Sequence, residues 1–364
     1  MNNKKLLMVL GPTEIEEDIL ALGAEPQVYM RTSDYSKKLE RIFKNLQYVF
    51  QTKNPVIFFA SSGTGAMEAA VTNVLSKNDT VLYINGGSFG DRWGKICRLH
   101  GINTIELKVE FGESVNPSDV KDILVKNKNI KAVFATLDET SSGALTDIKS
   151  IGDIIKDYKD TMFIVDAVSG LIVEPLQTDE WNIDIVVSSS QKAMAIPPGL
   201  GFMSISEKAL EYAKTANLRN FYFDIFDHIA NWKRNQTPFT PAVSLLNQLD
   251  LRLEKIKAEG LEQYRNRYSK ITNLIRKGLT NLGFEVLAKH PANCVTGILT
   301  EEYDASEIVR IMREKHNIEI APSGGDLKTK LFRVGNFGAI NEQNVDYFIN
   351  AMQKTIEELN NDRK

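Results

Sequence analysis

The chain has 364 residues, of which 43% are hydrophobic and 25% charged, and its formal net charge is -3. This composition is typical of a globular protein with room for two domains, and it excludes disordered, collagen-like and coiled-coil chains. The near balance of acidic and basic side chains provides no strong field for nucleic acid or an anionic membrane. We therefore expect chemistry on small molecules.

The sequence also bears on the compartment. Its two cysteines, Cys97 and Cys294, are far apart and have neither disulfide-scaffold nor zinc-site spacing, and the four histidines show no metal-binding pattern, so we expect no metal. The apolar run 6–10 is shorter than the core of a secretion signal, and no uncharged run is as long as a membrane span. These features predict a cytoplasmic protein.

From about residue 37 to 206, short apolar runs alternate with amphipathic stretches, which predicts βα units around a mostly parallel sheet. Runs such as VIFFA and MFIVD are continuously apolar, as expected of strands with helices on both faces. The expected strands are 56–60, 80–84, 104–109, 132–137, 162–166, 183–188 and 201–205, and the expected helices are 36–50, 66–75, 91–99, 117–125 and 148–156.

The pattern changes at TPFTP (237–241), where we place a domain boundary. We predict a large domain over 14–240 and a smaller α+β domain over 241–364, with segment 1–13 packing near the smaller one. The second part should contain helices at 242–257, 261–282, 305–315 and 342–359, and strands at 284–288, 295–300, 318–321 and 331–334.

The first candidate ligand site is the run SSGTG (61–65), which follows VIFFA and precedes a helix. Small residues let the backbone wrap closely round an anion, and a helix N-terminus offers unpaired N–H groups and the positive end of its dipole. Ser62, Gly63 and Thr64 thus make a competent phosphate site, although such residues are also ordinary helix caps. The run lacks the Lys-Ser/Thr ending of a P-loop, and Glu68 stands where GxGxxG needs glycine.

The second candidate is Asp166, which ends the expected strand 162–166. Ligands of open α/β sheets collect at that edge. A carboxylate that follows buried aliphatic residues needs a cationic or hydrogen-bonding partner to stay charged. An aspartate at a strand end is also a common turn former.

The third candidate is Lys192, which follows the next expected strand and precedes the rigid turn Pro-Pro-Gly (197–199). It should lie at the same sheet edge as Asp166 and have restricted freedom. A lysine with a pKa lowered by desolvation can form a Schiff base, whereas the ordinary alternative is a solvated loop lysine.

Together these three features match the needs of one cofactor, pyridoxal 5'-phosphate. Asp166 would pair with the pyridinium nitrogen, Lys192 would bind the aldehyde, and residues 62–64 would bind the phosphate. Each feature explains the others, and we therefore expect this cofactor.

A wider similarity is carried by runs that occur in order along the chain: GPT (11–13), SSGTGAMEA (61–69), NGGSFGDR (85–92), ETSSG (139–143), VDAVSG (165–170), SQKAMAIPPGLGF (190–202), TPFTPAVSLL (237–246) and FRVGNFG (332–338). With these runs the sequence resembles the class V aminotransferases of fold type I, closest to the alanine–glyoxylate, serine–glyoxylate and serine–pyruvate branch. The resemblance implies a large domain with a mostly parallel seven-stranded sheet covered by helices, and a smaller C-terminal α+β domain.

The resemblance gives Lys192 and Asp166 the same roles and adds three cofactor contacts. Gln191 stands near the phosphate, and Ser141 falls at a position with a cofactor-contacting hydroxyl. Phe89 occupies the position of the aromatic residue that stacks on the cofactor ring, where tryptophan is common; phenylalanine keeps the π-face and loses the indole donor.

The resemblance also suggests substrate contacts and a dimer. Arg333 corresponds to the arginine that binds the substrate α-carboxylate, for which a guanidinium fork is well suited. Thr240 should reach the phosphate of a neighbouring subunit, which would require a homodimer. Thr237 stands where tyrosine is common and Thr64 where some members have histidine, so only the backbone role of Thr64 carries over. Arg31 either lines the substrate entrance or is a solvated loop arginine.

Cysteine desulfurases and lyases share this scaffold but fit less well. They usually carry histidine at the positions of Gln191 and Phe89, and desulfurases need a mobile cysteine, which the loop 321–330 lacks. Cys97 and Cys294 are more typical of buried structural thiols.

The sequence thus predicts an aminotransferase that moves the amino group of alanine or serine to glyoxylate or pyruvate by a ping-pong mechanism. A 2-aminoethylphosphonate aminotransferase remains an alternative within the class, since donor and acceptor depend on contacts that the sequence does not place. A catalytically silent cofactor-binding protein is a second alternative. A dinucleotide-dependent oxidoreductase, with GTGAM as its nucleotide turn, would leave Lys192 unexplained.

Overall fold

The continuous apolar runs form a seven-stranded, mostly parallel sheet, which confirms the expected fold class. The structure is a computed structural model and describes residues 5–361. In sheet order the strands are β2 (Val56–Phe59), β10 (Gly201–Ile205), β9 (Ile185–Ser189), β8 (Met162–Asp166), β5 (Ile130–Thr136), β3 (Thr80–Asn85) and β4 (Asn103–Lys108). β10 runs antiparallel to both of its neighbours, whereas the pairs from β9 to β4 are parallel.

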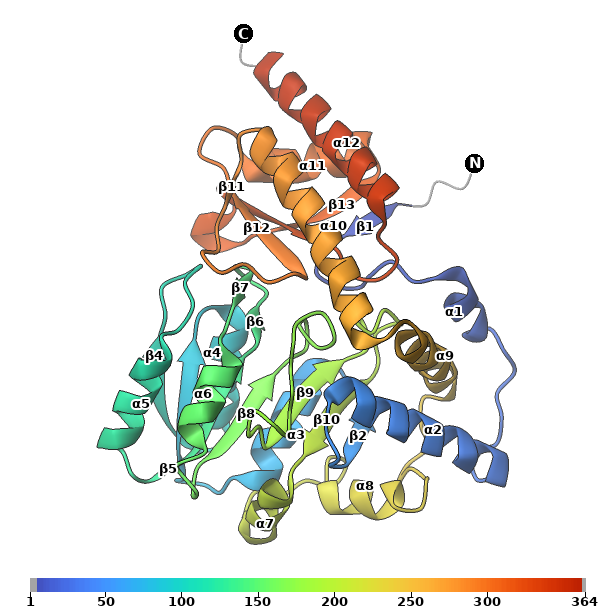
Figure 1. The fold of residues 1–364 in the computed structure, drawn as a ribbon, viewed down its shortest axis with the longest axis vertical. Helices are drawn as coiled ribbons and strands as arrows, with labels where there is room; N and C mark the ends of the chain where they lie inside the picture. Colours follow the sequence, from blue (N-terminus) through green and yellow to red (C-terminus); the bar gives the residue numbers. More distant parts are fainter. Residues whose placement is uncertain (1–4, 362–364) are drawn as a thin grey trace.

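Helices cover both faces of this sheet because both sides of its strands are apolar. Along β2, Phe58 belongs to one core, while Ile57 and Phe59 belong to the other. The first core receives α2 (Ser33–Phe50), α5 (Pro117–Lys126), α6 (Ile148–Ile155) and α9 (Val243–Glu259); the second receives α3 (Gly63–Val74), α4 (Ser88–Leu99), α7 (Glu207–Thr215) and α8 (Ile225–Trp232). Figure 1 shows these helices around the sheet in the lower part of the molecule.

A second sheet, of five strands, lies in the upper part of Figure 1. Its order is β1 (Leu6–Met8), β13 (Ile318–Pro322), β14 (Leu331–Gly335), β12 (Val295–Leu299) and β11 (Glu285–Val286). β1 comes from the N-terminal segment and pairs in parallel with β13, with Leu6 opposite Ile318. Residues 1–4 of that segment lie outside the described residues. α11 (Ala305–Lys315) and α12 (Glu342–Asn361) pack on this sheet in a third core.

The long helix α10 (Leu261–Asn281) connects the two parts. Its residues Tyr264 and Tyr268 belong to the first core of the large sheet, whereas Ile271 and Ile275 belong to the core of the second sheet. One helix thus fixes the position of both sheets, and in Figure 1 it runs from α9 up to the C-terminal helices.

The expected elements agree with the observed ones to within a few residues, but several were not predicted. The strand expected over 284–288 is reduced to β11. The elements missed were β1, α1 (Glu17–Leu22), the hairpin β6 (Asp138–Glu139) and β7 (Ala144–Leu145), α7, α8 and a 3-10 turn, Gly325–Leu327. Short elements carry too few residues for a clear period.

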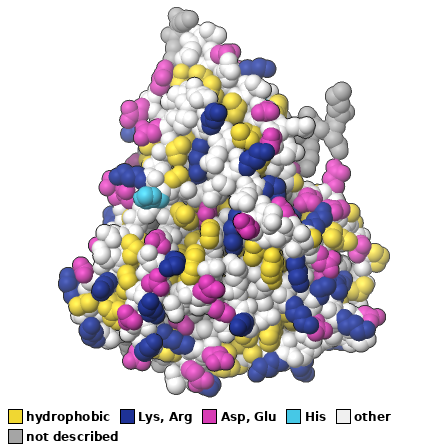
Figure 2. All heavy atoms as spheres, viewed as in Figure 1, with side chains coloured by type: hydrophobic (Ala, Val, Ile, Leu, Met, Phe, Trp, Pro, Cys, Tyr) yellow, Lys and Arg dark blue, Asp and Glu magenta, His cyan; other side chains and the backbone are white. Residues whose placement is uncertain are grey.

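The surface carries both signs of charge. In the view of Figure 2, basic and acidic side chains are interspersed over both parts of the molecule. Within residues 5–361, none of the helices combines the length and apolar character needed to cross a bilayer.

Candidate active site

The carboxyl ends of β8 and β9 bring two of the candidate residues to one edge of the large sheet. Asp166 is the last residue of β8, and Lys192 follows β9, its parallel neighbour, by three positions. Both side chains are buried, Asp166 with 3% and Lys192 with 7% of its surface exposed. Lys192 is therefore not the solvated loop lysine of the ordinary alternative.

The turn that carries Lys192 is held by hydrogen bonds along its own backbone. The Ser190 N–H donates to the carbonyl of Leu200 (3.0 Å), and the Ala195 N–H donates to the carbonyl of Lys192 (2.9 Å). Gly11 lies directly against this turn: a Cβ there would come within 3.0 Å of the Gln191 carbonyl and 3.2 Å of Lys192 Cδ, and its φ is +108°. Only glycine fits this place, so the early GPT run supports the lysine.

The amine of Lys192 lies among aromatic rings. Its Nζ is 5.8 Å from the ring centre of Phe89 and 5.6 Å from that of Phe337. Burial lowers the pKa of Lys192, against the raising effect of the charges of Asp138, Cys294 and Asp166. A neutral amine is the form that attacks an aldehyde, so this environment favours a Schiff base.

The carboxyl of Asp166 accepts a hydrogen bond from the backbone N–H of Val168 at 2.8 Å. Burial raises the pKa of Asp166 to about 6, although that hydrogen bond and the positive charge of Arg92 oppose the effect. The carboxyl is thus mostly ionised at neutral pH. A cation beside it would stabilise the ionised form further.

The N-terminus of α3 lies at the same edge. Ser62 occupies the N-cap position, but within the described residues its hydroxyl caps no backbone N–H, so the ordinary helix-cap reading does not apply to it. A Cβ on Gly63 would come within 2.6 Å of Val168 Cγ2 and 3.4 Å of Ser189 Cβ, which places the helix start against the ends of β8 and β9. The Thr64 hydroxyl accepts a hydrogen bond from Arg92 (2.8 Å).

Phe89 is held in place from two sides. The Glu139 carboxylate accepts the backbone N–H groups of Phe89 (3.2 Å) and Gly90 (2.9 Å) in the first turn of α4. The guanidinium of Arg92 lies 4.7 Å from the centre of the Phe89 ring. The hydroxyl of Ser141 donates to Glu139 and accepts the N–H of Ser88 (3.2 Å). The ETSSG run therefore fixes the aromatic side chain.

Arg333 lies on β14, half-buried, and faces the ETSSG run. Its Nη1 donates to the carbonyl of Thr140 (3.2 Å) and its Nη2 to that of Pro322 (2.6 Å), while its Nε is buried without a partner. Within the described residues it forms no ion pair. Burial lowers the pKa of Arg333, and Glu139 opposes this effect. A carboxylate ligand would supply the missing countercharge.

The remaining expected residues lie in two places. Gln191 lies beside Lys192, and its Oε1 is buried without a partner. Thr240 is exposed, in the segment between α8 and α9, while the Thr237 hydroxyl donates to the carbonyl of Phe239 (2.8 Å). Arg31 is exposed and donates to the side chain of Gln236 and the carbonyl of Thr237, both at 2.8 Å. Within this chain, Thr240 is not brought to Lys192.

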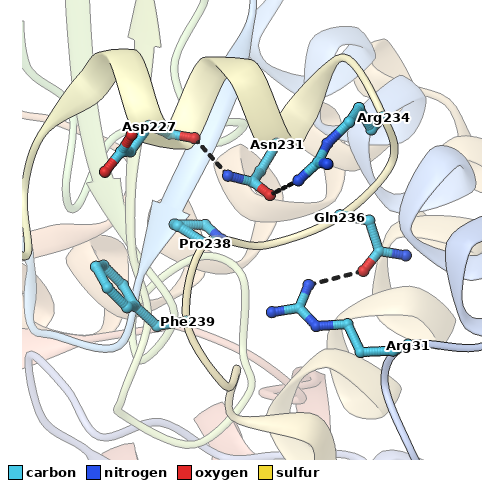
Figure 3. Close-up of a pocket in the computed structure, with 7 residues that line it drawn as sticks. All are labelled: Arg31, Asp227, Asn231, Arg234, Gln236, Pro238 and Phe239. Atoms are coloured by element: carbon cyan, nitrogen blue, oxygen red, sulfur yellow. Dashed lines mark hydrogen bonds between the residues drawn. The ribbon is translucent and has the colours of Figure 1, made fainter.

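Arg31 and Gln236 line an open pocket of about 550 Å³. Figure 3 shows Arg31 reaching toward Gln236 from one side, with Asp227, Asn231 and Arg234 along α8 and the following turn on the other. The pocket is polar and carries two arginines. It is separate from the site round Lys192.

Sequence reasoning missed Asp138, Glu139, Arg92 and the role of Cys294. Asp138 is almost fully buried; its Oδ2 accepts the Cys294 thiol (3.2 Å), and its Oδ1 has no partner. Burial raises the pKa of Asp138 well above its usual range. Glu139 and Arg92 belong to the runs ETSSG and NGGSFGDR, which the sequence analysis had identified. The contacts of these two side chains could not be predicted, because they depend on the fold. Within residues 5–361 no group of three or more His, Cys, Asp or Glu side chains is arranged to hold a metal ion.

The residues at this edge fit pyridoxal phosphate. Arg333 Nε, Gln191 Oε1 and Asp138 Oδ1 are buried without partners, and such atoms are costly unless a ligand or water meets them. An amine whose pKa is lowered by burial, a carboxylate and a helix N-terminus lie at the same sheet edge, as the aldehyde, ring nitrogen and phosphate require.

Comparisons with known proteins show which chains and folds this protein is similar to. A family profile described as "Aminotransferase class-V" matches residues 16–330. The chain is 32% identical over 350 residues to a Paracoccus denitrificans protein named L-aspartate--glyoxylate aminotransferase, covering 94% of this chain and 88% of that protein. It is 35% identical over 364 residues to a Synechococcus protein named soluble hydrogenase, small subunit, covering 99% and 94%. Its fold matches alanine--glyoxylate aminotransferase from Nostoc, with a TM-score of 0.93 and 25% identity over 97% of this chain and 95% of that one.

Proposed function

Because this chain belongs to the class V aminotransferases, which use pyridoxal phosphate, we propose that it moves the amino group of alanine or serine to glyoxylate or pyruvate. Glyoxylate appears in the printed names of the Paracoccus relative and of the Nostoc structure, which supports it as acceptor. The observation that carries the proposal is the buried Lys192 amine between Phe89 and Phe337, at the same sheet edge as Asp166.

The edge of the large sheet provides residues for each part of the cofactor. Asp166 would hold the ring nitrogen, and Phe89 would lie on the ring face. The phosphate would meet the start of α3 and its neighbours, with contacts from Ser62, Gly63, Thr64 and Gln191, and Ser141 would contact the cofactor from the ETSSG run. When bound, the cofactor supplies an electron sink for the charge left at the substrate Cα after proton removal.

Lys192 would move the proton. Its Nζ, whose pKa burial lowers, would take the proton from the substrate Cα as general base and, as general acid, would deliver it to C4′ of the bound cofactor. The aromatic walls of Phe89 and Phe337 exclude water from the amine, which keeps its proton from exchanging freely. Its anchored turn restricts the amine to a short path.

Arg333 would orient both substrates by their α-carboxylates. Among residues 5–361 its Nε has no partner and its guanidinium has no acidic neighbour in an ion pair, which supports a contact with a carboxylate ligand. Because donor and acceptor would use the same arginine in turn, the kinetics should be ping-pong.

A second copy of the chain would complete the site. Thr240 is exposed and would reach the phosphate in the neighbouring copy. Beside it, Phe221 is 82% exposed, and the rings of Tyr222 and Phe239 stack with centres 5.0 Å apart, which gives this segment an apolar surface. The arginine-lined pocket of Figure 3 lies at the same segment and would become part of the interface. Thr237, whose hydroxyl is engaged locally, would act only through its backbone.

Sulfur transfer is less well supported. Burial raises the pKa of the Cys97 thiol to about 12 and that of Cys294 well above its usual range. Thiols in this state are poor nucleophiles. Two free cysteine thiols suit a reducing compartment, and we therefore propose that the enzyme is cytoplasmic. We also propose that its two domains divide after residue 240.

The test is an assay of purified protein with added pyridoxal phosphate. Alanine, serine, aspartate and 2-aminoethylphosphonate are offered as donors against glyoxylate, pyruvate and 2-oxoglutarate. Transfer from alanine or serine to glyoxylate or pyruvate is expected, together with borohydride-dependent labelling of Lys192 by mass spectrometry. A protein that stays colourless and is not labelled at Lys192 contradicts the proposal. A preference for 2-aminoethylphosphonate as donor would show that the proposed donors, alanine and serine, are wrong.

A further inference from the structure

A buried polar cluster of α9 and α10 contacts the turn that carries Lys192. Arg252, on α9, is 2% exposed; Tyr264 and Tyr268, on α10, are 0% and 1% exposed. The two phenol rings stack with centres 5.1 Å apart, and the guanidinium of Arg267 lies 4.6 Å from the Tyr264 ring. We call Arg252, Tyr264 and Tyr268 the clamp.

The clamp holds the Lys192 turn by its carbonyls. Arg252 Nε donates to the carbonyl of Met194 (3.0 Å), and the Tyr264 hydroxyl donates to that of Ala193 (3.1 Å). These are the two residues that follow Lys192. The next residue, Ala195, has a φ of +47°, which is unusual for a residue with a Cβ. Such a backbone persists only where its surroundings fix it.

The clamp also holds the segment that follows Arg333. The backbone N–H of Gly338 donates to the Tyr268 hydroxyl at 2.9 Å. Gly338 ends the FRVGNFG run that begins on β14, so the same cluster contacts the supports of the amine and of the guanidinium. The two hydroxyls lie 3.4 Å apart and connect these contacts.

The contacts allow a single direction for the hydroxyl protons. The Tyr264 hydroxyl donates its proton to the Ala193 carbonyl and accepts a hydrogen bond from an Arg252 Nη. In the contact between the two hydroxyls Tyr268 is therefore the donor. Tyr268 in turn accepts the backbone N–H of Gly338. Each of the two hydroxyls then both donates and accepts, and such a chain of hydrogen bonds strengthens itself in a buried environment. The remaining Nη1 of Arg252 pairs with Glu16 at 2.7 Å.

We propose that Arg252, Tyr264 and Tyr268 are positioning residues that fix the Lys192 turn and the Gly338 segment relative to each other, so that the amine moves on a rigid backbone. The proposal rests on the proposed role of Lys192. A proton carried between fixed atoms is sensitive to displacements of about 1 Å. By holding both the Lys192 turn and the segment that follows Arg333, the clamp would keep the distance between the amine and the substrate carboxylate constant.

The test compares Tyr264→Phe with Tyr268→Phe and uses Tyr35→Phe as the matched control. Tyr35 is buried on α2, and its hydroxyl has no partner, so its loss removes a hydroxyl without touching the clamp. Hydrogen exchange of residues 193–196 and thermal stability are measured for each full-length variant, with cofactor bound and with cofactor removed. The pH midpoint of the bound cofactor's visible absorbance, kcat and KM are measured with cofactor bound.

Tyr264→Phe should speed exchange in residues 193–196 by about tenfold, the effect of losing a buried hydrogen bond. It should also move the absorbance midpoint and lower kcat with little change in KM. Tyr268→Phe should instead raise KM for amino acids, because its direct contact is with the Gly338 segment. Tyr35→Phe should change none of these quantities.

The proposal is overturned if Tyr264→Phe lowers thermal stability but leaves exchange, absorbance midpoint and kcat as in the wild type. If Tyr264→Phe does not fold, Arg252→Lys, which keeps the charge and shortens the reach, must give the same exchange and absorbance changes or the clamp is rejected. A wild type that forms no adduct at Lys192 contradicts the proposed function, while the exchange measurement still decides whether the clamp holds the turn.

Discussion

Two arginines, Arg252 fully buried and Arg333 half-buried, lie in regions that differ in how completely their side chains are hydrogen-bonded. Arg252, between α9 and α10, donates to a carbonyl, a carboxylate and a hydroxyl. Arg333, on β14 of the second sheet, donates to two carbonyls, and within the described residues its Nε is unpaired and it has no acidic partner. The first region is complete by itself, whereas the second is complete only with a ligand.

This difference shows how a buried charged side chain that only stabilises the fold can be told from one that binds a ligand. Both regions bury cations, and burial alone would mark both as candidates. Unpaired atoms separate them, because Arg333 Nε, like Gln191 Oε1 and Asp138 Oδ1, has no partner among the described residues. Substitutions in the sheet edge should therefore change activity more than stability, and substitutions in the clamp should change both.

Lys192→Ala should give the largest effect. Turnover should fall by about 10⁴-fold or more, because both the Schiff base and the proton carrier are lost. The free energy of unfolding should not fall by more than about 1 kcal/mol, since the lost amine is desolvated by burial. Steady-state kinetics and urea unfolding measure the two quantities, and a variant with near-normal kcat would exclude the mechanism.

Arg252→Met should show the contrasting behaviour. Removing a buried cation that is paired with Glu16 leaves the Met194 carbonyl without its donor and should cost about 3–5 kcal/mol of unfolding free energy. Urea unfolding of the cofactor-free protein measures it. A loss below about 1 kcal/mol would show that this region is not the complete structural cluster that its contacts describe.

Asp166→Asn should change the pH dependence of stability. The folded-state pKa of Asp166 is raised to about 6, so the folded protein binds more protons than the unfolded chain between about pH 4 and 6. Unfolding free energy contributed by Asp166 therefore falls as pH rises through that window, by about 3 kcal/mol in total. Without cofactor, the variant should gain stability over the wild type between pH 4 and 7 in urea titrations. A constant difference would contradict the raised pKa.

Arg333→Ala should weaken carboxylate substrates by about 1.5–3 kcal/mol in kcat/KM, the scale of a charge-assisted hydrogen bond. A simple alkylamine without a carboxylate is the control substrate, and its slow reaction should be unaffected. Equal losses for both substrates would show that Arg333 acts on the site's structure, and no loss would remove it from the site.

Phe89→Leu should give the smallest effect. The loss of ring stacking should weaken cofactor binding by about 0.5–1.5 kcal/mol, whereas Phe89→Trp should retain it. Cofactor titration followed by fluorescence quenching measures both variants. If leucine binds the cofactor as tightly as phenylalanine, the ring face is not held by Phe89.

Much of this site could be predicted from the chain alone. The continuous apolar runs VIFFA and MFIVD specify strands buried on both faces, and a parallel sheet brings the residues after its strands to one edge. Asp166, Lys192 and the start of α3 were therefore expected together, and the structure places all three at that edge. The pattern could not indicate Asp138 or Arg252, whose partners are distant in sequence.

The sequence by itself determined the alternation of strands and helices and the residue types that end each strand, because apolar periodicity and the chemistry of single side chains are local properties. Only the tertiary structure decided which buried groups have partners. The pairing of Arg252 with the Tyr264 hydroxyl depends on the position of α10, and the contact of Arg333 with the Thr140 carbonyl depends on the packing of β14 beside the ETSSG run. Hydrogen bonds between segments separated by tens of residues follow from packing, which no local pattern encodes.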